Sequence, residues 1–352
     1  MVPRHWDTVV KLKHFEFWNT HLFHLPVYLY WLYLSFRARS PFFFSAANPG
    51  IETGGLLGES KYRILEKIDK RYLPTTLYYE NVPTVEQLLK ELAREKITFP
   101  FVVKPDIGQG GWMVDMILDR QDLDRFLAKI KMPFMVQEYV DDPLELGVLY
   151  YRLPHEPRGR ISSLAIKELL SVTGNGKDSV QALLALNPRA RHSLQKLSPG
   201  KKISLHHVPS KGKTIQVSFI ANHSYGTKFL NGNDQIDEQI TQLFDTLSKN
   251  ISGFYFGRFD IRCESMEALK KGEFRILELN GVGSEPLHIF DPTEKLRRAY
   301  RTAFLHWKAI YRISMINMKA GIACMTWREA WRIYKMVSAI QRIHKTNFTI
   351  GN

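Results

Sequence analysis

Two short segments place acidic, basic and amide side chains at the spacing of β-strands. Arg258 and Asp260 are two residues apart, and so are Glu278 and Asn280. Because the side chains of a strand point alternately to its two faces, each pair shares one face. If the two strands are neighbours, the oxygen atoms meet beside a guanidinium, a set that suits Mg²⁺ or Mn²⁺ bound together with phosphates. The alternative is a sheet surface crossed by salt bridges.

A lysine followed by a glycine-rich turn forms a second candidate site. Lys104 ends the apolar run 101–104, and Gly108, Gly110 and Gly111 follow within seven residues. Glycine lets backbone N–H groups approach phosphate oxygens, and the lysine adds a positive charge. The pattern suits a lid over phosphates, although many surface hairpins also contain Gly and Lys. It matches neither the P-loop nor the dinucleotide fingerprint.

The elements around these residues predict a chain of mixed α and β structure. Apolar runs bounded by turn residues indicate strands, and apolar residues at helical spacing indicate helices. We expect strands at 101–104, 112–118, 134–140, 144–152, 161–169, 215–220, 254–262 and 274–279, and helices at 121–131 and 234–250. The first two strands would form a hairpin, and the last two would carry the candidate metal ligands.

The composition is that of a folded protein with one strongly basic end. With 44% apolar and 24% charged residues, the 352-residue chain is too apolar for intrinsic disorder and long enough for about two domains. Residues 295–352 hold 12 basic residues and one acid, which is +11 of the total charge of +14. Cys263 and Cys324 cannot form a disulfide framework, and no Cys/His cluster has zinc-site spacing, so we expect a reducing, cytoplasmic compartment.

The N-terminal segment 17–36 has twenty residues and no formal charge. That length would span a bilayer, but His, Asn and Pro interrupt its first half, and Tyr and Trp in its second half favour the headgroup boundary. Three interpretations remain: an interfacial or re-entrant segment, a helix covered by the protein or a partner, and a transmembrane helix.

The C-terminal segment combines aromatic and basic residues at helical spacing. Trp327, Trp331 and Tyr334 form one stripe, and basic residues form the neighbouring stripe. Either the helix lies on an anionic membrane surface, or the aromatic stripe packs on the protein and the basic stripe is solvated. The same charges would suit nucleic acid, but no nucleic-acid motif accompanies them, so we expect no nucleic-acid partner.

Taken in order, these segments resemble the ATP-grasp superfamily, in particular D-alanine–D-alanine ligase and the cyanophycin-synthetase-like carboxylate–amine ligases. The resemblance covers roughly residues 60–291 and implies an α+β ATP-grasp fold in which two α+β subdomains grip ATP. It implies a division into an aromatic N-terminal segment at 1–58, an ATP-grasp domain at 59–292 with lobes at 59–137 and 138–292, and basic C-terminal helices at 293–352.

The resemblance also assigns roles to individual residues. Lys61 and Lys104 match the two ATP lysines and Arg258 the phosphate-contacting arginine, which makes these three the expected catalytic residues. The other nucleotide contacts would be Gly108, Gly110, Gly111, the hinge residues Glu138, Tyr139 and Val140, the ribose acid Glu145, and Lys167. Asp260, Glu278 and Asn280 match the magnesium ligands.

Several departures from the family concern the acceptor substrate. Only sixty residues precede Lys61, where family ligases usually begin with a compact substrate domain. The serine pair often found in the phosphate loop is replaced by Gln109 and Gly110. Glu285, His288 and Asp291 lie where an acceptor would bind, although capping and loop roles explain them equally well.

The resemblance implies a ligase that uses ATP and Mg²⁺ or Mn²⁺ to join a small-molecule or peptide carboxylate to an amine, or to a thiol, through an acyl phosphate. A phosphotransferase acting on a hydroxyl or carboxylate is the alternative, and a nucleotide-binding protein without turnover is a third. The basic tail and the aromatic N-terminal segment would act separately from this chemistry, by placing the cytoplasmic enzyme at the inner face of a membrane.

Overall fold

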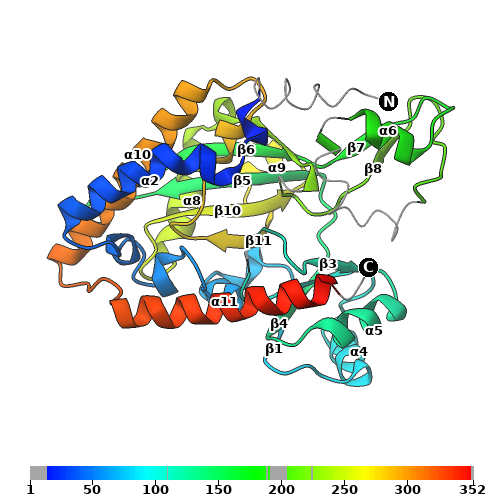
Figure 1. The fold of residues 1–352 in the computed structure, drawn as a ribbon, viewed down its shortest axis with the longest axis horizontal. Coiled ribbons are helices and arrows are strands. Elements are labelled where there is room, and N and C mark those ends of the chain that lie inside the picture. The colour runs from blue at the N-terminus through cyan, green and yellow to red at the C-terminus, as the bar shows by residue number, and fades with distance from the viewer. Residues whose placement is uncertain (1–13, 109, 188, 191–203, 223–224, 350–352) are drawn as a thin grey trace.

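Two antiparallel sheets form the body of the protein, and helices cover their outer faces (Figure 1). The computed structural model describes residues 14–349 apart from 109, 188, 191–203 and 223–224. The predicted α+β class is confirmed. Every described strand pair is antiparallel.

The first sheet has the strand order β1-β4-β2-β3. Its strands are β1 (Thr76–Tyr79), β2 (Phe101–Pro105), β3 (Asp115–Ile117) and β4 (Phe134–Glu138), and α4 (Val85–Arg94) and α5 (Arg120–Lys129) cover one face. In β2 the side chains of Phe101 and Val103 pack under these helices. Strand alternation therefore turns Lys104 to the opposite face, toward the second sheet.

The second sheet has the strand order β11-β10-β5-β6-β9. Its strands are β5 (Leu144–Tyr151), β6 (Arg160–Glu168), β9 (Lys228–Asn231), β10 (Phe256–Cys263) and β11 (Arg275–Asn280). One face packs against α8 (Glu238–Lys249) and α9 (Met266–Lys270). The predicted pairing of the two metal-ligand strands is confirmed, because β10 and β11 are neighbours.

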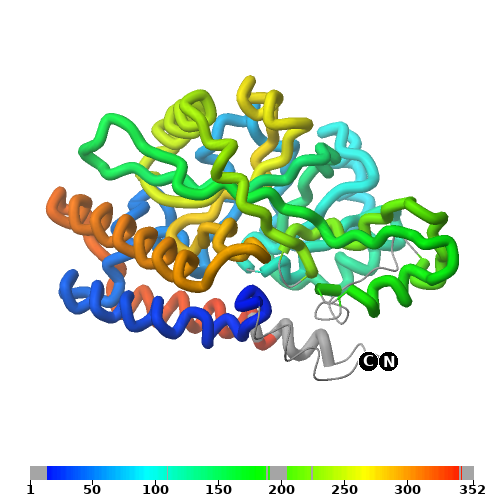
Figure 2. The backbone as a smooth tube through the Cα atoms, turned by 90° about the horizontal axis from the view of Figure 1, so that it is seen from above, coloured from blue at the N-terminus to red at the C-terminus, as the bar shows by residue number. Residues whose placement is uncertain are grey.

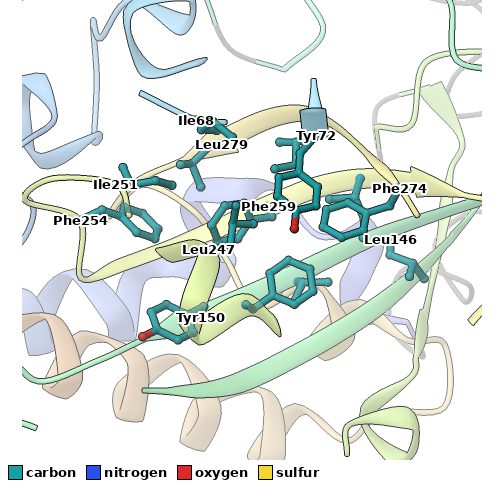
Figure 3. Packing of buried hydrophobic residues seen from close by; sticks show 14 of the residues in the cluster. Ile68, Tyr72, Leu146, Tyr150, Leu247, Ile251, Phe254, Phe259, Phe274 and Leu279 are labelled. Atoms are coloured by element: carbon teal, nitrogen blue, oxygen red, sulfur yellow. The ribbon is translucent and has the colours of Figure 1, made fainter. Parts of the chain in front are cut away.

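Aromatic residues fill the core between the second sheet and α8. Phe259 of β10 lies against Phe244 and Phe254, with ring centroids 5.4 and 5.6 Å away, and Phe274 completes the group (Figure 3). All four side chains are almost completely buried. Because phenylalanines occupy the inner face of β10, its polar side chains lie on the opposite face.

Two predicted strands are shorter in the structure. The second strand of the glycine-rich hairpin is Asp115–Ile117 rather than 112–118, because Gly111 and Met113 have φ values of +76° and +51° that a strand cannot hold. The predicted strand 215–220 ends early as β8 (Thr214–Gln216), which pairs with β7 (Ser171–Thr173). There the Ser218 hydroxyl accepts the N–H of Ile220 in place of a strand partner.

Three long helices lie on one side of the molecule. They are α2 (Thr20–Ala38), α10 (Leu296–Lys319) and α11 (Trp327–Thr349). The N-terminal segment is thus helical, and its inner face packs against α10 through ring contacts such as Phe23 with Tyr300, 5.2 Å apart. Within the described residues, no helix combines the length and apolar character needed to cross a membrane.

Short elements connect the main ones. They are α3 (Lys61–Leu65), α6 (Val180–Leu186), and the 3₁₀ turns η1 (Phe15–Phe17), η2 (Phe43–Ala46), η3 (Glu52–Gly54), η4 (Lys70–Tyr72), η7 (Asn233–Gln235) and η8 (Leu287–Phe290). Ser60 caps α3 by accepting the N–H of Arg63. This cap fixes the start of the helix at Lys61.

Candidate active site

Strand β10 presents three charged side chains on one face. Arg258, Asp260 and Arg262 alternate with Phe259 and Ile261, which are fully buried in the core. Moving the strand by one residue would bury the charges among phenylalanines, so the hydrophobic pattern fixes their direction. The hydrophobic packing on one face of β10 thus positions the charged side chains on its opposite face.

The neighbouring strands complete this face. Asp260 lies opposite Glu278 of β11, and Arg258 lies opposite Asn280. On the other side, Gly147 of β5 lies opposite Asp260. A Cβ at position 147 would come within 3.2 Å of the Arg258 Cδ and 3.4 Å of the Asp260 Oδ1. Glycine therefore leaves the room that these two side chains occupy.

Asp260 is the centre of a network of donors. Arg258 donates from Nε to Oδ1 at 2.9 Å and from Nη2 to Oδ2 at 3.0 Å, Lys167 lies 2.9 Å from Oδ1, and Asn280 donates to Oδ2 at 2.9 Å. Burial alone would raise the pKa of Asp260, but Arg258 and Lys167 outweigh it and hold that pKa far below its usual range. The carboxylate is ionised at neutral pH.

Glu278 is the second carboxylate of the site. Lys61 Nζ donates to its Oε1 at 2.7 Å. Burial opposes ionisation of Glu278, yet Lys61 and Lys104 lower its pKa overall. Lys61 reaches the carboxylate from the start of α3, in a segment that precedes both sheets. The structure thus brings the first predicted ATP lysine to the predicted metal ligands.

Lys104 links the two sheets. From β2 it donates to the side chain of Gln137 at 3.0 Å and to the backbone carbonyl of Leu277 in β11 at 2.9 Å. Its side chain is buried, and burial lowers its pKa to about 8, against the opposing pull of Glu278. The second predicted lysine is therefore a buried cation whose charge depends on pH near neutrality.

Lys167 and Arg262 enclose Glu145, the predicted ribose acid. Lys167 donates to its Oε1 at 3.2 Å and Arg262 to its Oε2 at 2.8 Å. Arg262 also donates to the backbone carbonyl of Val140 at 2.6 Å and lies over the ring of Tyr139. These contacts join the predicted adenine hinge to the charged cluster.

Two predicted parts of the site have no described contact with the cluster. The carboxylate of Glu138 accepts the N–H of Thr75 at 3.2 Å instead. In the glycine-rich loop, a Cβ at Gly111 would approach Ile220 and Tyr225, 3.1 Å away from each. Gly110 has a φ of +68° and would meet no atom within 4 Å, and Gly108 is near the ring of Trp112.

Ion pairs and hydrogen bonds connect five basic side chains with three carboxylates. The basic members are Lys61, Lys104, Lys167, Arg258 and Arg262, and the acidic members are Glu145, Asp260 and Glu278. Further carboxylates lie close by, because Glu59 and Asp106 help to raise the pKa of Lys61, and Glu285 helps to raise that of Arg258. Five cations that converge from separate elements can bind the oxygens of a polyanionic ligand.

The acidic members fit a magnesium ion by the chemistry of their donors. Asp260 and Glu278 are ionised carboxylates on paired strands, and Asn280 adds an amide on the same face. The part of the chain that the structure describes contains no group of three or more His, Cys, Asp or Glu residues that could hold a metal ion. A metal here would need oxygens from phosphate or water as well, which is typical of Mg²⁺.

The segment after β11 borders this cluster. The backbone carbonyl of Glu285 accepts a hydrogen bond from Arg258 Nη1 at 3.1 Å, and its side chain is bonded to His24 of α2. His288 is buried against Ser163, and burial lowers its pKa to about 4. Asp291 accepts hydrogen bonds from Thr293 and Asn231, as a capping residue does. Of the three acceptor candidates, Glu285 alone contacts a residue of the cluster.

Sequence reasoning missed three residues that support the site. Arg262 continues the two-residue period of Arg258 and Asp260, so the pattern could have identified it. Asp106 accepts hydrogen bonds from the Ser60 hydroxyl and the Tyr62 N–H, and its carbonyl accepts from Lys61, which ties the two lysine segments together. No local signal points to His24, because its partner is 261 residues away.

The chain is similar to several solved ligase structures. It is 13% identical to the VanG D-Ala:D-Ser ligase from Enterococcus faecalis, with 72% of this chain and 61% of that chain covered and a TM-score of 0.41. It is 12% identical to the D-alanine–D-alanine ligase from Bacillus anthracis, with 74% of this chain and 67% of that chain covered and a TM-score of 0.39. It is 17% identical to a bifunctional glutathione synthetase from Pasteurella multocida, with 70% of this chain and 36% of that chain covered and a TM-score of 0.35.

The chain spans only part of these proteins, namely 36% of the glutathione synthetase and 61% of the VanG ligase. No protein-family model matches the chain, and no curated protein matches it.

Proposed function

We propose that the protein is an ATP-grasp enzyme that joins a carboxylate to an amine or thiol at the expense of ATP. The observation that carries this proposal is the connected set of five cations and three carboxylates between the two sheets. Its five cations suit the phosphates of a nucleotide, and Asp260 and Glu278 suit the accompanying metal ion.

Lys61, Lys104 and Lys167 are the proposed phosphate ligands. They come from α3, β2 and β6, so a triphosphate bound among them would hold the two sheets together. Arg258 lies beside them with Asp260 as its bidentate partner. Fixed cations of this kind stabilise the charge that develops as a phosphoryl group moves.

Asp260, Glu278 and Asn280 are the proposed magnesium ligands. The ion would neutralise phosphate charge and polarise the phosphoryl group. Binding it requires Lys61 and Lys167 to share or release the carboxylate oxygens that they contact in the structure. The lysines then become available to the phosphates.

The base and sugar of the nucleotide are assigned to the segment after β4. The backbone of Glu138, Tyr139 and Val140 would meet adenine, and Glu145 would accept the ribose hydroxyls. Glu145 is held in place by Arg262 and Lys167. The glycines at 108, 110 and 111 would cover the phosphates once a nucleotide is bound.

The proposed reaction has two steps and needs no nucleophilic side chain. A carboxylate oxygen of the substrate attacks the γ-phosphorus, ADP leaves, and an acyl phosphate forms. The amine nitrogen or thiol sulfur then attacks the acyl carbon, phosphate leaves, and the acceptor loses its proton. Positioning and charge stabilisation account for the catalysis.

The substrates are proposed to be a small-molecule or peptide carboxylate and an acceptor, bound beside Arg258 and Glu285. On the acceptor side the sequence departs from the D-alanine ligases that it resembles, and α2 contributes His24 to Glu285 there. His288 and Asp291 have the structural partners described above. We therefore expect D-alanine to be a poor acceptor.

A screen of carboxylate and acceptor pairs, read out by ADP, phosphate and product together, tests this proposal. We expect one ADP and one phosphate for each amide or thioester formed, and little ADP without the acceptor. ADP that forms without an acceptor, with the phosphate retained on the product, would instead identify a phosphotransferase.

Glu278→Gln is the matching variant, with Glu168→Gln as its control because Glu168 is exposed and pairs with Lys228 on the same sheet. Loss of a metal ligand is expected to lower turnover by about 100-fold or more. Full turnover by Glu278→Gln with the true substrates would show that the metal assignment is wrong.

A further inference from the structure

Helix α2 is apolar on both faces, although the protein covers only one of them. Its inner face, with Phe23, Val27 and Leu34, is buried. Its outer face presents leucine, tyrosine and phenylalanine side chains to solvent, at Leu22, Leu25, Tyr28, Leu29, Leu32, Tyr33 and Phe36. A helix that is apolar all round normally has both faces covered, so this outer face requires an occupant.

Helix α11 presents a second exposed stripe on the same side of the molecule. Trp327, Trp331 and Tyr334 are exposed, while its inner side packs Ile333 and Val337 against the backbone at Gly58. Of this stripe, Trp327 contacts Phe42, with the ring centroids 4.7 Å apart, and is still 73% exposed. Figure 2 shows α2 and α11 along one edge of the molecule, and in Figure 1 α2 lies between α10 and α11.

Basic side chains are exposed on α10 and α11, the two helices between which α2 lies in Figure 1. Exposed residues of α10 include Arg301, Lys308 and Arg312, and those of α11 include Arg328 and Arg332. The sequences of α2, α10 and α11 contain a single acidic residue, Glu329. An apolar face edged by Lys and Arg, with Trp and Tyr among them, is the composition of surfaces that lie in a membrane interface.

We propose that the outer faces of α2 and α11 form a docking surface for an anionic lipid bilayer. The leucines of α2 would enter the boundary between headgroups and acyl chains, while the arginines and lysines contact lipid phosphates. The helices would lie parallel to the bilayer plane and not cross it. The proposal assigns the occupant of this surface independently of the ATP chemistry.

Charge favours lipid over a second copy of the chain. A two-fold dimer places the same patch of each copy against itself. The basic borders of α10 and α11 would then face their own equivalents, and like charges across an interface repel. An anionic bilayer removes this repulsion and covers the same apolar residues.

Co-sedimentation of the full chain with vesicles, without ATP, tests the proposal. Vesicles of phosphatidylglycerol and phosphatidylcholine should bind the protein at least about tenfold more strongly than phosphatidylcholine alone, and added salt should weaken the binding. No binding to the anionic vesicles would overturn the proposal.

The matched variants are Leu29→Ser on α2 and Leu186→Ser on α6, which are 62% and 63% exposed. Unchanged thermal unfolding of both would show that the fold is intact. Leu29→Ser should weaken vesicle binding about tenfold, and Leu186→Ser should leave it unchanged. Equal binding by both variants contradicts the proposal. The proposal is also contradicted if the wild type forms a dimer that Leu29→Ser dissociates, while neither the wild type nor this variant binds vesicles. A second copy of the chain would then be the occupant of the surface.

Discussion

Lys104 is the residue whose environment most directly connects burial with a measurable property. It lies between the sheets, bonded to Gln137 and Leu277, and burial lowers its pKa to about 8. The lysine is therefore charged below pH 8 and progressively neutral above it. A neutral amine attracts phosphate less strongly than an ammonium.

We expect the affinity for ATP to fall as pH rises through about 8, by up to about tenfold per unit, because the bound state requires the ammonium. Calorimetric titrations between pH 7 and pH 9.5 would measure this dependence. Lys104→Arg, whose guanidinium stays charged, should remove most of it. An identical pH dependence in the wild type and in Lys104→Arg would show that another group titrates.

The lack of a side chain at Gly147 leaves room for Arg258, and this can be tested by substitution. An alanine there would have its Cβ 3.1 Å from Leu287 Cδ1 and 3.2 Å from Arg258 Cδ, so the arginine must move. Gly147→Ala should lower kcat/KM by about tenfold or more, because small displacements of positioned groups reduce rates strongly.

Gly232→Ala is the control for this variant. Gly232 directly follows β9, and a Cβ there would lie 2.6 Å from Leu164 Cδ2 of β6 and away from Arg258. It should cost stability, by about 1–3 kcal/mol, while leaving the ATP affinity unchanged. If denaturation shows similar stability losses and both variants keep full activity per folded molecule, Gly147 has no positioning role.

At the scale of elements, α2 is part of the folded body through one face. Phe23 packs against Phe15, Phe290 and Tyr300, and its carbonyl accepts a hydrogen bond from the Tyr300 hydroxyl at 3.0 Å. The same helix brings His24 to Glu285 beside Arg258. Loosening α2 would therefore disturb the acceptor side of the site.

Phe23→Ala and Phe36→Ala form a matched pair on this helix, since the first side chain is 3% exposed and the second 85%. Removing the buried ring should lower the free energy of unfolding by about 3 kcal/mol. Removing the exposed ring should change it by less than about 0.5 kcal/mol. Equal effects in urea denaturation would mean that α2 does not pack as described.

Local sequence patterns predicted those site residues whose positions depend on a single strand. The two-residue period placed Arg258 with Asp260 and Glu278 with Asn280, and the structure has both pairs on the shared face. Contacts between distant elements had no such signal: the bonds of Lys104 to Leu277 and of His24 to Glu285 arise only when sheets and helices stack.

Helix α11 shows a different limit of periodicity. Its aromatic stripe and its Ile333, Met336 and Val337 stripe are both apolar, so spacing alone does not decide which faces inward. In the structure the aliphatic stripe packs near Gly58, whose φ of +80° and lack of a Cβ admit those side chains. Because this face of α11 lies close to the backbone at Gly58, the smaller aliphatic side chains face inward.

At the scale of the whole molecule, the charge of +14 divides into two parts that lie in different places. Most of the excess lies in 295–352, on helices that border the proposed lipid surface. The cations of the candidate site lie elsewhere, between two sheets whose contact passes through Lys104 and the carbonyl of Leu277. A polyanion bound there would connect both sheets.

The central claim is that this cluster binds a nucleotide triphosphate. The most direct measurement is calorimetric titration of ATP with Mg²⁺ into the wild type, Lys104→Met and Lys228→Met. Lys228 is a partly exposed lysine of β9 in the second sheet, where it pairs with Glu168. We predict one ATP per chain, at least about tenfold weaker binding by Lys104→Met, and unchanged binding by Lys228→Met. No saturable binding by the wild type, or equal binding by all three proteins, would contradict the account.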